Sequence, residues 1–204
     1  MIRVLFVLLF LSSCGNLPIT YLQNFSSVNS VIFGFPEYEI TEDLLNEYEN
    51  SFIKVRFGRG PHAILILAFE DDGVYEWVGA DGVKVFTFNG RIIKTVGLPN
   101  NFEIPKPSND FLSSRDVYET INLYNPDLLS ATLNRSMSTR KTTINKLGRK
   151  IQVNRIEESF EIEAIGWKGV NIYYQNTSSD QIESSEQKIH PRLPVAKIEY
   201  YFKY

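Results

Sequence analysis

The sequence holds little of the chemistry on which most enzymes and metal sites depend. One cysteine, Cys14, and two histidines, His62 and His190, occur in 204 residues. A metal site needs clustered His, Cys or carboxylate ligands at set spacing, and the two isolated histidines are more typical of ordinary polar rim residues. No serine lies in the Gly-x-Ser-x-Gly pattern of a nucleophile elbow. The sequence therefore predicts neither an enzyme nor a bound metal or cofactor.

Basic charge and long apolar runs are also scarce. The chain has 21 Lys+Arg against 24 Asp+Glu, a formal net charge of −3. A nucleic-acid partner would require a strongly basic face, so this balance argues against one. No apolar run approaches the roughly 20 residues that cross a bilayer as a helix. We therefore expect everything after the amino-terminal segment to be water-soluble.

The amino terminus has the layout of a secretory signal. Arg3 is followed by the apolar run Val4–Leu11 and then by two small residues. The end of this segment, Leu11-Ser-Ser-Cys14, resembles the lipobox of bacterial lipoproteins, in which the signal is cut before a lipid-bearing cysteine. We predict that residues 1–13 are a signal peptide and that Cys14 is lipidated. A soluble secreted protein whose signal happens to contain a cysteine is the alternative.

Acyl chains on Cys14 would hold the mature chain at a membrane, because each buried CH₂ contributes about 0.8 kcal/mol. Gly15 and Asn16 follow, with no aspartate beside the cysteine. By resemblance to enterobacterial sorting rules, this favours the outer membrane, with the protein facing the periplasm. Residues 14–31 carry no charge and are predicted to be a lipidated tether. Residues 32–204 suffice for a single domain.

One short helix is expected near the start of this domain. In the segment 40–50, Thr41 can cap the helix, and Leu44, Leu45 and Tyr48 fall on one face. The six acidic residues around this segment are expected to form a solvated outer face. From Ser51 onward the period of the apolar residues changes from 3.6 to 2, which is typical of strands.

The strand region predicts an antiparallel meander. Asp-Gly and Asn-Gly turns at 72–73, 81–82 and 89–90 separate alternating segments, and these are strong hairpin signals. The apolar run 62–69 is expected to be covered on both faces. The proline-rich segment 98–110 is predicted to be a crossover loop.

The second half of the chain continues the strand pattern. Residues 117–124 are predicted to form a strand or a short helix, and 139–155 a hairpin. The polar segment 176–188 is expected to be a mobile loop, and 195–204 a final aromatic strand. With about ten strands in all, the fold class is mostly β. It is a single antiparallel domain, open-barrel or sandwich-like, with one short amino-terminal helix.

One cluster of charge is a candidate binding strip. Arg140, Lys141, Arg149 and Lys150 lie on the predicted hairpin and could meet an anionic glycan or headgroup. Pairing with the glutamates at 157–163 on the next strand is the alternative that we favour. Six aromatic residues could stack on sugars, although core packing explains most such residues. They are Trp77, Trp167, Tyr173, Tyr174, Tyr200 and Tyr201.

Three segments carry a family resemblance: Val55–Leu67, Trp77–Val83 and Asn89–Leu98. With the lipobox and Pro194–Ile198 in order, the chain resembles the YjbF/GfcB family of lipoproteins linked to capsule and exopolysaccharide operons. The resemblance implies a β-rich, open-barrel-like domain at the outer membrane that is an accessory in polysaccharide export. It supplies no catalytic residues.

Three functions follow as hypotheses. The first is a non-enzymatic lipoprotein that assists capsule or exopolysaccharide assembly or export through contacts with export proteins or glycan in the periplasm. The second is a carrier whose open, apolar barrel shields a lipid or lipid-linked glycan. The third is an enzyme that modifies polysaccharide, for which convergent carboxylates about 5–9 Å apart would be the signature.

Overall fold

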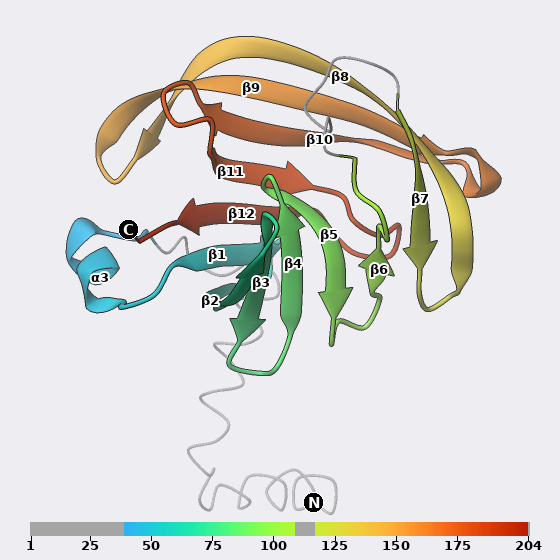
Figure 1. Cartoon of the computed structure of the whole chain (residues 1–204), viewed down its shortest axis with the longest axis horizontal. Helices are drawn as coiled ribbons and strands as arrows, with labels where there is room; N and C mark the ends of the chain where they lie inside the picture. The colour runs from blue at the N-terminus through green and yellow to red at the C-terminus, as the bar shows by residue number, and fades with distance from the viewer. Residues whose placement is uncertain (1–38, 109–116, 204) are drawn as a thin grey trace, which may run out of the picture. The chain divides into compact units, whose positions relative to one another are not determined.

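The computed structural model describes residues 39–108 and 117–203, and these belong to one compact unit within Glu37–Tyr204 (Figure 1). The predicted signal peptide, Cys14 and the tether lie outside the described residues. In the described part of the chain, twelve strands form a closed barrel in which each strand pairs with its neighbours in sequence, and β1 pairs with β12. The strands are β1 (Phe52–Phe57), β2 (His62–Asp71), β3 (Val74–Gly79), β4 (Lys84–Phe88), β5 (Arg91–Val96), β6 (Phe102–Glu103), β7 (Val117–Leu123), β8 (Leu128–Lys146), β9 (Arg149–Ile162), β10 (Trp167–Asn176), β11 (Ile182–Gln187) and β12 (Ala196–Tyr201).

Tight two-residue turns connect several of the consecutive antiparallel strands. Asn89 and Gly90 have φ values of 49° and 73°, and Leu147 and Gly148 have 50° and 71°. Two successive positive φ angles are the geometry of the tight turns that match the twist of paired strands. The predicted antiparallel β fold is confirmed. The barrel is closed rather than open, because β1 and β12 pair in continuous register from Phe52↔Tyr201 to Phe57↔Ala196.

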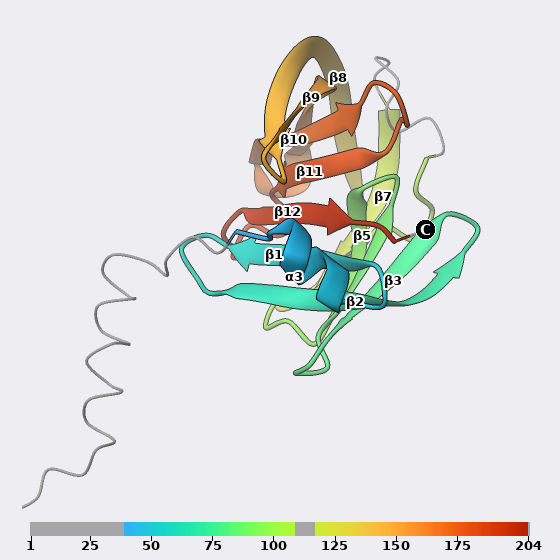
Figure 2. The same cartoon turned by 90° about the vertical axis from the view of Figure 1, so that its left-hand side faces the viewer.

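The predicted helix is confirmed as α3 (Glu42–Glu47). The Thr41 hydroxyl caps it by accepting a hydrogen bond from the Leu44 N–H at 3.2 Å. The helix lies outside the barrel against β1 and β2 (Figure 2), where Ile40, Phe52 and Tyr201 form a small buried cluster. Within the described ranges, no helix is long and apolar enough to cross a membrane.

The expectation that residues 62–69 are covered on both faces is wrong. Leu65 is buried inside the barrel, and Ile64 and Ile66 pack into the cluster beneath α3. Beyond the end of this short helix nothing covers the outer face among the described residues, so Phe69 is 61% exposed. The apolar run alone did not show whether the outer face of this strand is covered along its whole length or along only half of it.

Two segments differ from the predicted boundaries. Within the predicted crossover loop, Phe102 is buried and β6 bridges β5 and β7. The predicted hairpin at 139–155 is the outer part of a much longer one, since β8 has 19 residues and β9 has 14. The segment at 117–124, for which the sequence left a strand or a helix open, is a strand.

The predicted mobile loop at 176–188 is wrong in its second half, which is strand β11 between β10 and β12. Two of its polar side chains, Ser185 and Gln187, are buried and have partners inside the barrel. The buried Gln187 side chain accepts a hydrogen bond from the Ile92 N–H at 2.9 Å and donates one to the Gly90 carbonyl at 2.9 Å. The polar residues of this segment therefore predicted an exposed loop. The structure instead has a strand whose Gln187 side chain hydrogen-bonds to the start of β5 and to the turn before it.

Candidate functional site

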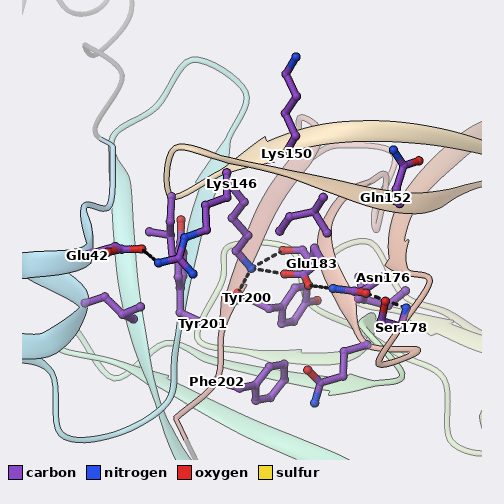
Figure 3. Close-up of a pocket in the computed structure, with 16 residues that line it drawn as sticks. Glu42, Lys146, Lys150, Gln152, Asn176, Ser178, Glu183, Tyr200, Tyr201 and Phe202 are labelled. Atoms are coloured by element: carbon purple, nitrogen blue, oxygen red, sulfur yellow. Dashed lines mark hydrogen bonds and ion pairs between the residues drawn. The ribbon is translucent and has the colours of Figure 1, made fainter.

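A groove of about 530 Å³ lies beneath the tip of the β8–β9 hairpin (Figure 3). In an antiparallel meander the even-numbered strands all run the same way, so β8, β10 and β12 end at the same end of the barrel. The hairpin tip, the loop after β10 and the residues after β12 therefore gather there. The tip ends near α3 (Figure 1), and Leu147 packs on the Tyr201 cluster.

Lys146 fastens the hairpin tip to the barrel wall. Its Nζ donates to Glu183 Oε2 on β11 at 2.5 Å and to the Tyr200 carbonyl on β12 at 2.5 Å. The same ammonium lies 4.8 Å from the centre of the Tyr201 ring, a cation–π contact. Burial, and then the hydrogen bond to Glu199, raise the pKa of Tyr201 above its ordinary value, so its phenol remains neutral. The groove thus has a fixed floor.

The loop after β10 forms the far wall of the groove. Asn176 Nδ2 donates to Glu183 Oε1 at 2.7 Å, and Asn176 Oδ1 accepts from the Ser178 N–H at 2.8 Å (Figure 3). Glu183 is therefore held on one oxygen by Lys146 and on the other by Asn176. A side chain held on both oxygens positions its neighbours and is not free to act as a general base.

The four residues of the predicted basic strip lie in two separate places in the structure. Arg149 and Lys150 line the groove, where Arg149 pairs with Glu42 of α3 at 2.6 Å and Lys150 points away from the floor (Figure 3). Arg140 and Lys141 lie further down the hairpin stem, where Arg140 is 3.7 Å from Glu157. The structure thus brings together two of the four residues, and a binding role for the strip stays a prediction.

A second set of charges is buried inside the barrel. Arg91 donates to Glu119 Oε2 at 2.6 Å, and Arg135 Nε donates to the same oxygen at 2.8 Å. Glu158 Oε1 lies 3.3 Å from Arg91 Nη2 and 3.8 Å from Arg135 Nε. These four side chains, which we call the interior tetrad, are 0–4% exposed. They come from β5, β7, β8 and β9, so they connect strands across the barrel as well as neighbouring ones.

Neutral side chains complete the interior tetrad. Glu158 Oε2 accepts from Asn171 Nδ2 at 2.8 Å and from the Tyr173 hydroxyl at 2.7 Å. Burial, and then the charge of Glu158, raise the pKa of Tyr173 well above its ordinary value, so the phenol remains a donor. Burial opposes ionisation of Glu119, but the Arg91 charge and hydrogen bond outweigh it and lower its pKa. The tetrad therefore sets two arginines against two carboxyl groups, each within hydrogen-bond or ion-pair distance of a partner.

The space around the interior tetrad is small. The cavity beside Arg91 and Glu158 has a volume of about 20 Å³, which suffices for about one water molecule. Glu119 and Glu158 are the carboxylates that converge within the barrel, and both are ion-paired and buried. This arrangement stabilises a protein core and offers no access to a glycan bond.

The histidines do not form a site. His190 is 1% exposed, and its Nδ1 accepts from the Arg192 N–H at 3.1 Å. Burial, and then the Arg192 charge, lower its pKa, which keeps the ring neutral. The prediction of a rim position is therefore wrong for His190. His62 lies at the start of β2, with its Nε2 3.5 Å from Arg56 Nη1. Within residues 39–108 and 117–203, no group of three potential ligands could hold a metal.

Most of the six aromatic residues belong to the core, as the sequence favoured. Trp77, Tyr173, Tyr200 and Tyr201 are buried, and Trp77 Nε1 donates to Thr87 Oγ1 at 2.8 Å. Trp167 packs edge-on against a phenylalanine of β9, and Tyr174 is half-buried. The sequence reasoning missed Tyr75 and Phe202, which lie two residues from Trp77 and Tyr200 on the same inward faces. The period of two along these strands was the available signal.

Together, these observations describe an antiparallel β-barrel whose interior holds a hydrophobic core and the interior tetrad, with grooves beneath and beside the hairpin tip. The crystal structure of the hypothetical lipoprotein YmcC from Escherichia coli (K12) has this fold, with a TM-score of 0.70 and 18% sequence identity over 87% of this chain and 95% of that one.

The chain belongs to the family described as group 4 capsule polysaccharide lipoprotein gfcB, YjbF, whose model matches residues 25–200. The uncharacterized lipoprotein GfcB of Escherichia coli K12 is 22% identical over 191 residues, which cover 89% of this chain and 88% of GfcB. The lipoprotein YjbF of the same strain is 31% identical over 65 residues, or 32% of this chain and 31% of YjbF. The family resemblance seen in the sequence is confirmed.

Proposed function

We propose that this chain is an outer-membrane lipoprotein that faces the periplasm and assists the assembly or export of a capsule-type polysaccharide without catalysing a reaction. Its family is described as a capsule polysaccharide lipoprotein, and its relatives are lipoproteins. Cys14 in the lipobox-like sequence is the residue we propose to carry the anchor. The working surface would then be the outside of the barrel.

The observation that carries this proposal is the contrast between the small space around the interior tetrad and the larger grooves at the hairpin tip. The cavity beside the tetrad measures about 20 Å³, whereas the two grooves lined by the hairpin tip measure about 530 and 780 Å³. Pockets that hold small ligands are roughly 300–1,000 Å³. Contacts with glycan or with export proteins are therefore favoured at the outer surface.

The same contrast weakens the two alternatives. A carrier would need an open apolar lumen, but packed hydrophobic side chains and the interior tetrad occupy the inside of the described barrel. A polysaccharide-modifying enzyme would need accessible convergent carboxylates. Glu119 and Glu158 converge but are buried and paired with arginines. Neither alternative is supported by a specific feature of the site.

Deleting the gene in the source bacterium tests the proposal. We expect less polysaccharide at the cell surface, with full recovery when the wild-type gene is restored. The repeating unit of the remaining polysaccharide should be chemically unchanged, because an accessory protein alters amount and not structure. An altered repeating unit would favour the enzyme instead. An unchanged amount of surface polysaccharide would contradict the proposal.

The anchor has its own test. Replacing Cys14 with serine should abolish lipidation, leaving the signal uncut or the product detached from membranes. Mass spectrometry of the mature amino terminus and membrane fractionation measure this directly. An unmodified Cys14 in the wild-type protein, or cleavage at another position, would overturn the lipoprotein assignment of this residue.

A further inference from the structure

A second opening lies at the barrel end where the hairpin tip folds over. This cleft has a volume of about 270 Å³ and lies between the β4–β5 turn and the loop after β10. We call it the mouth cleft. It shares Gln181, Ile182, Tyr200 and Phe202 with the groove beneath the hairpin tip. The two openings are therefore neighbours on one side of the molecule, and Figure 3 shows Phe202 next to Tyr200.

Aromatic rings form one wall of the mouth cleft. Tyr200 is buried, while Tyr75 and Phe202 are half-buried, and the buried Trp77 packs behind these two. Phe202 stacks nearly parallel to Tyr200, with ring centroids 6.2 Å apart and an interplanar angle of 8°. Tyr75 meets Phe202 edge-on at 5.5 Å. This cluster holds each outer ring in a fixed orientation.

Polar residues also line the mouth cleft. The loop between β10 and β11 is ordered from within, because Gln175 Nε2 donates to the Asp180 carbonyl at 3.0 Å and the Asp180 N–H donates to the Asn176 carbonyl at 3.0 Å. Asp180 and Gln181 of this loop line the cleft, together with Asn89 of the β4–β5 turn. Among the described residues that line the cleft, none carries a positive charge.

These features select a ligand class. An anionic ligand would meet the Asp180 carboxylate with no lining cation among the described residues to balance it, and a lipid chain would leave the polar wall unpaired. A pyranose ring has an apolar face of C–H groups and a rim of hydroxyls. A cleft lined by both aromatic rings and polar side chains offers contacts for both parts of such a ring. The cleft volume fits about one or two rings.

We propose that the mouth cleft binds neutral pyranose units of a glycan, with Tyr75 and Phe202 as stacking surfaces and Asp180 and Asn89 as hydrogen-bonding groups. The proposal names a ligand class for the function proposed above and rests on it. A chain bound at the cleft can continue into the groove beneath the hairpin tip, because the two share the Phe202 wall.

Isothermal titration of the mature chain tests this, in a zwitterionic detergent whose headgroup is not a sugar. The probes are maltotriose, chitotriose, and the neutral and charged oligosaccharides released by partial hydrolysis of the source organism's own surface polysaccharide. Binding of a neutral probe should be the same at 0.1 M and 1 M salt, because no ion pair is formed. Phe202→Ala and Tyr75→Ala should each weaken it about 2- to 10-fold, the range of one aromatic contact.

The controls separate stacking from folding. Phe202→Tyr keeps a flat ring and should retain the affinity, whereas Phe202→Leu keeps an apolar side chain and should not. Phe69→Ala removes an aromatic ring that is 61% exposed and lies outside the cleft, and should leave the affinity unchanged. Thermal unfolding checks that each variant is folded.

The contradicting outcomes are equally specific. Binding of no neutral probe, or neutral binding that survives both alanine replacements, would overturn the cleft as a sugar site. Binding of charged fragments alone, lost at high salt, would move the site to the basic strip and would also overturn the proposal. If deleting the gene reduces surface polysaccharide but no probe binds, only the sugar-site inference is contradicted. If a sugar binds but deletion leaves surface polysaccharide unchanged, the proposed function is contradicted.

Discussion

Two ion pairs of equal length behave differently because one is buried. Arg91 and Glu119 in the interior tetrad lie 2.6 Å apart and are 4% and 3% exposed. Arg149 and Glu42, which join the hairpin tip to α3, also lie 2.6 Å apart but are 76% and 52% exposed. The N–O distance is the same in both pairs. The strength of the interaction differs, because water screens the outer pair and is excluded from the inner one.

The difference assigns the two regions to different tasks. An exposed pair contributes about 0–1 kcal/mol, so the hairpin tip can exchange Glu42 for another partner at little cost. Removing one member of a buried pair costs about 3–5 kcal/mol because a charge is left uncompensated. The interior tetrad therefore maintains the barrel, and the outer surface is available for binding.

The largest effect is expected from the interior tetrad. Glu158→Gln should lower the free energy of unfolding by about 3–5 kcal/mol, because Arg91 and Arg135 then share a single carboxylate. Urea unfolding of the mature chain measures this, with Glu42→Gln as the exposed control. Equal losses from the two replacements would contradict the contrast between interior and surface.

A double-mutant cycle sharpens that result. Arg135→Met combined with Glu119→Gln removes a buried cation and its carboxylate together. The double variant should be less destabilised than the sum of the two single variants, since each single change strands a charge that the double change removes. Simple additivity would show that the tetrad members are not coupled.

Two glycines with the same backbone conformation extend the comparison. Gly90 has φ +73° and its added Cβ would lie 2.5 Å from Ile182, whereas Gly148 at the hairpin tip has φ +71° with open space around it. Gly148→Ala should cost about 1–2 kcal/mol for the left-handed backbone alone. Gly90→Ala should cost about 1–3 kcal/mol more for overpacking. Comparable losses in urea unfolding would contradict this.

Acid should destabilise the folded chain in part by protonating Glu119. The pKa of Glu119 is lower in the folded chain than its ordinary value of about 4.3, so its contribution to stability is present above that pH. This contribution is lost as the pH falls through the folded pKa. Unfolding free energies between pH 3 and 7 should therefore decline below about pH 4.3, and Glu119→Gln should flatten the decline. Parallel curves for the variant and wild type would rule this out.

The smallest effect on stability is expected from the basic strip. Replacing Arg140, Lys141, Arg149 and Lys150 with glutamine should change the unfolding free energy by less than about 0.5 kcal/mol per site, because Arg140 and Arg149 are 68% and 76% exposed. If the strip contacts an anionic glycan, binding of polygalacturonate should weaken in this variant and with rising salt. Salt-independent or absent binding would retire the strip as a site.

The sequence predicted where the strands lie better than it predicted which strands pair and which side chains are buried. Turns such as Asn89-Gly90 were visible because two-residue hairpins need positive φ angles, which few residues adopt. Barrel closure was not visible, since it depends on pairing between β1 and β12 across the whole domain. Gln187 explains the missed strand β11, because a polar side chain reads as exposed unless its partners on β5 are known.

The interior tetrad shows the same limit for the candidate sites. In the sequence, Arg135 lies in the same basic segment as the strip, and Glu158 lies among the glutamates at 157–163 that we expected to pair with the strip. Both are buried, because strand alternation places them on the inward face with Glu119 and Arg91. The sequence shows how many charged residues a segment contains. Which of them remain accessible to a ligand depends on how the strands pack in three dimensions.

Hydrogen–deuterium exchange tests most directly whether glycan is contacted on the outside of the barrel. The mature chain is compared with and without the source organism's own surface polysaccharide. We expect slower exchange in the β4–β5 turn, the loop after β10 and the hairpin tip, with no change around the interior tetrad. Protection confined to the interior strands, or no protection anywhere, would contradict the account.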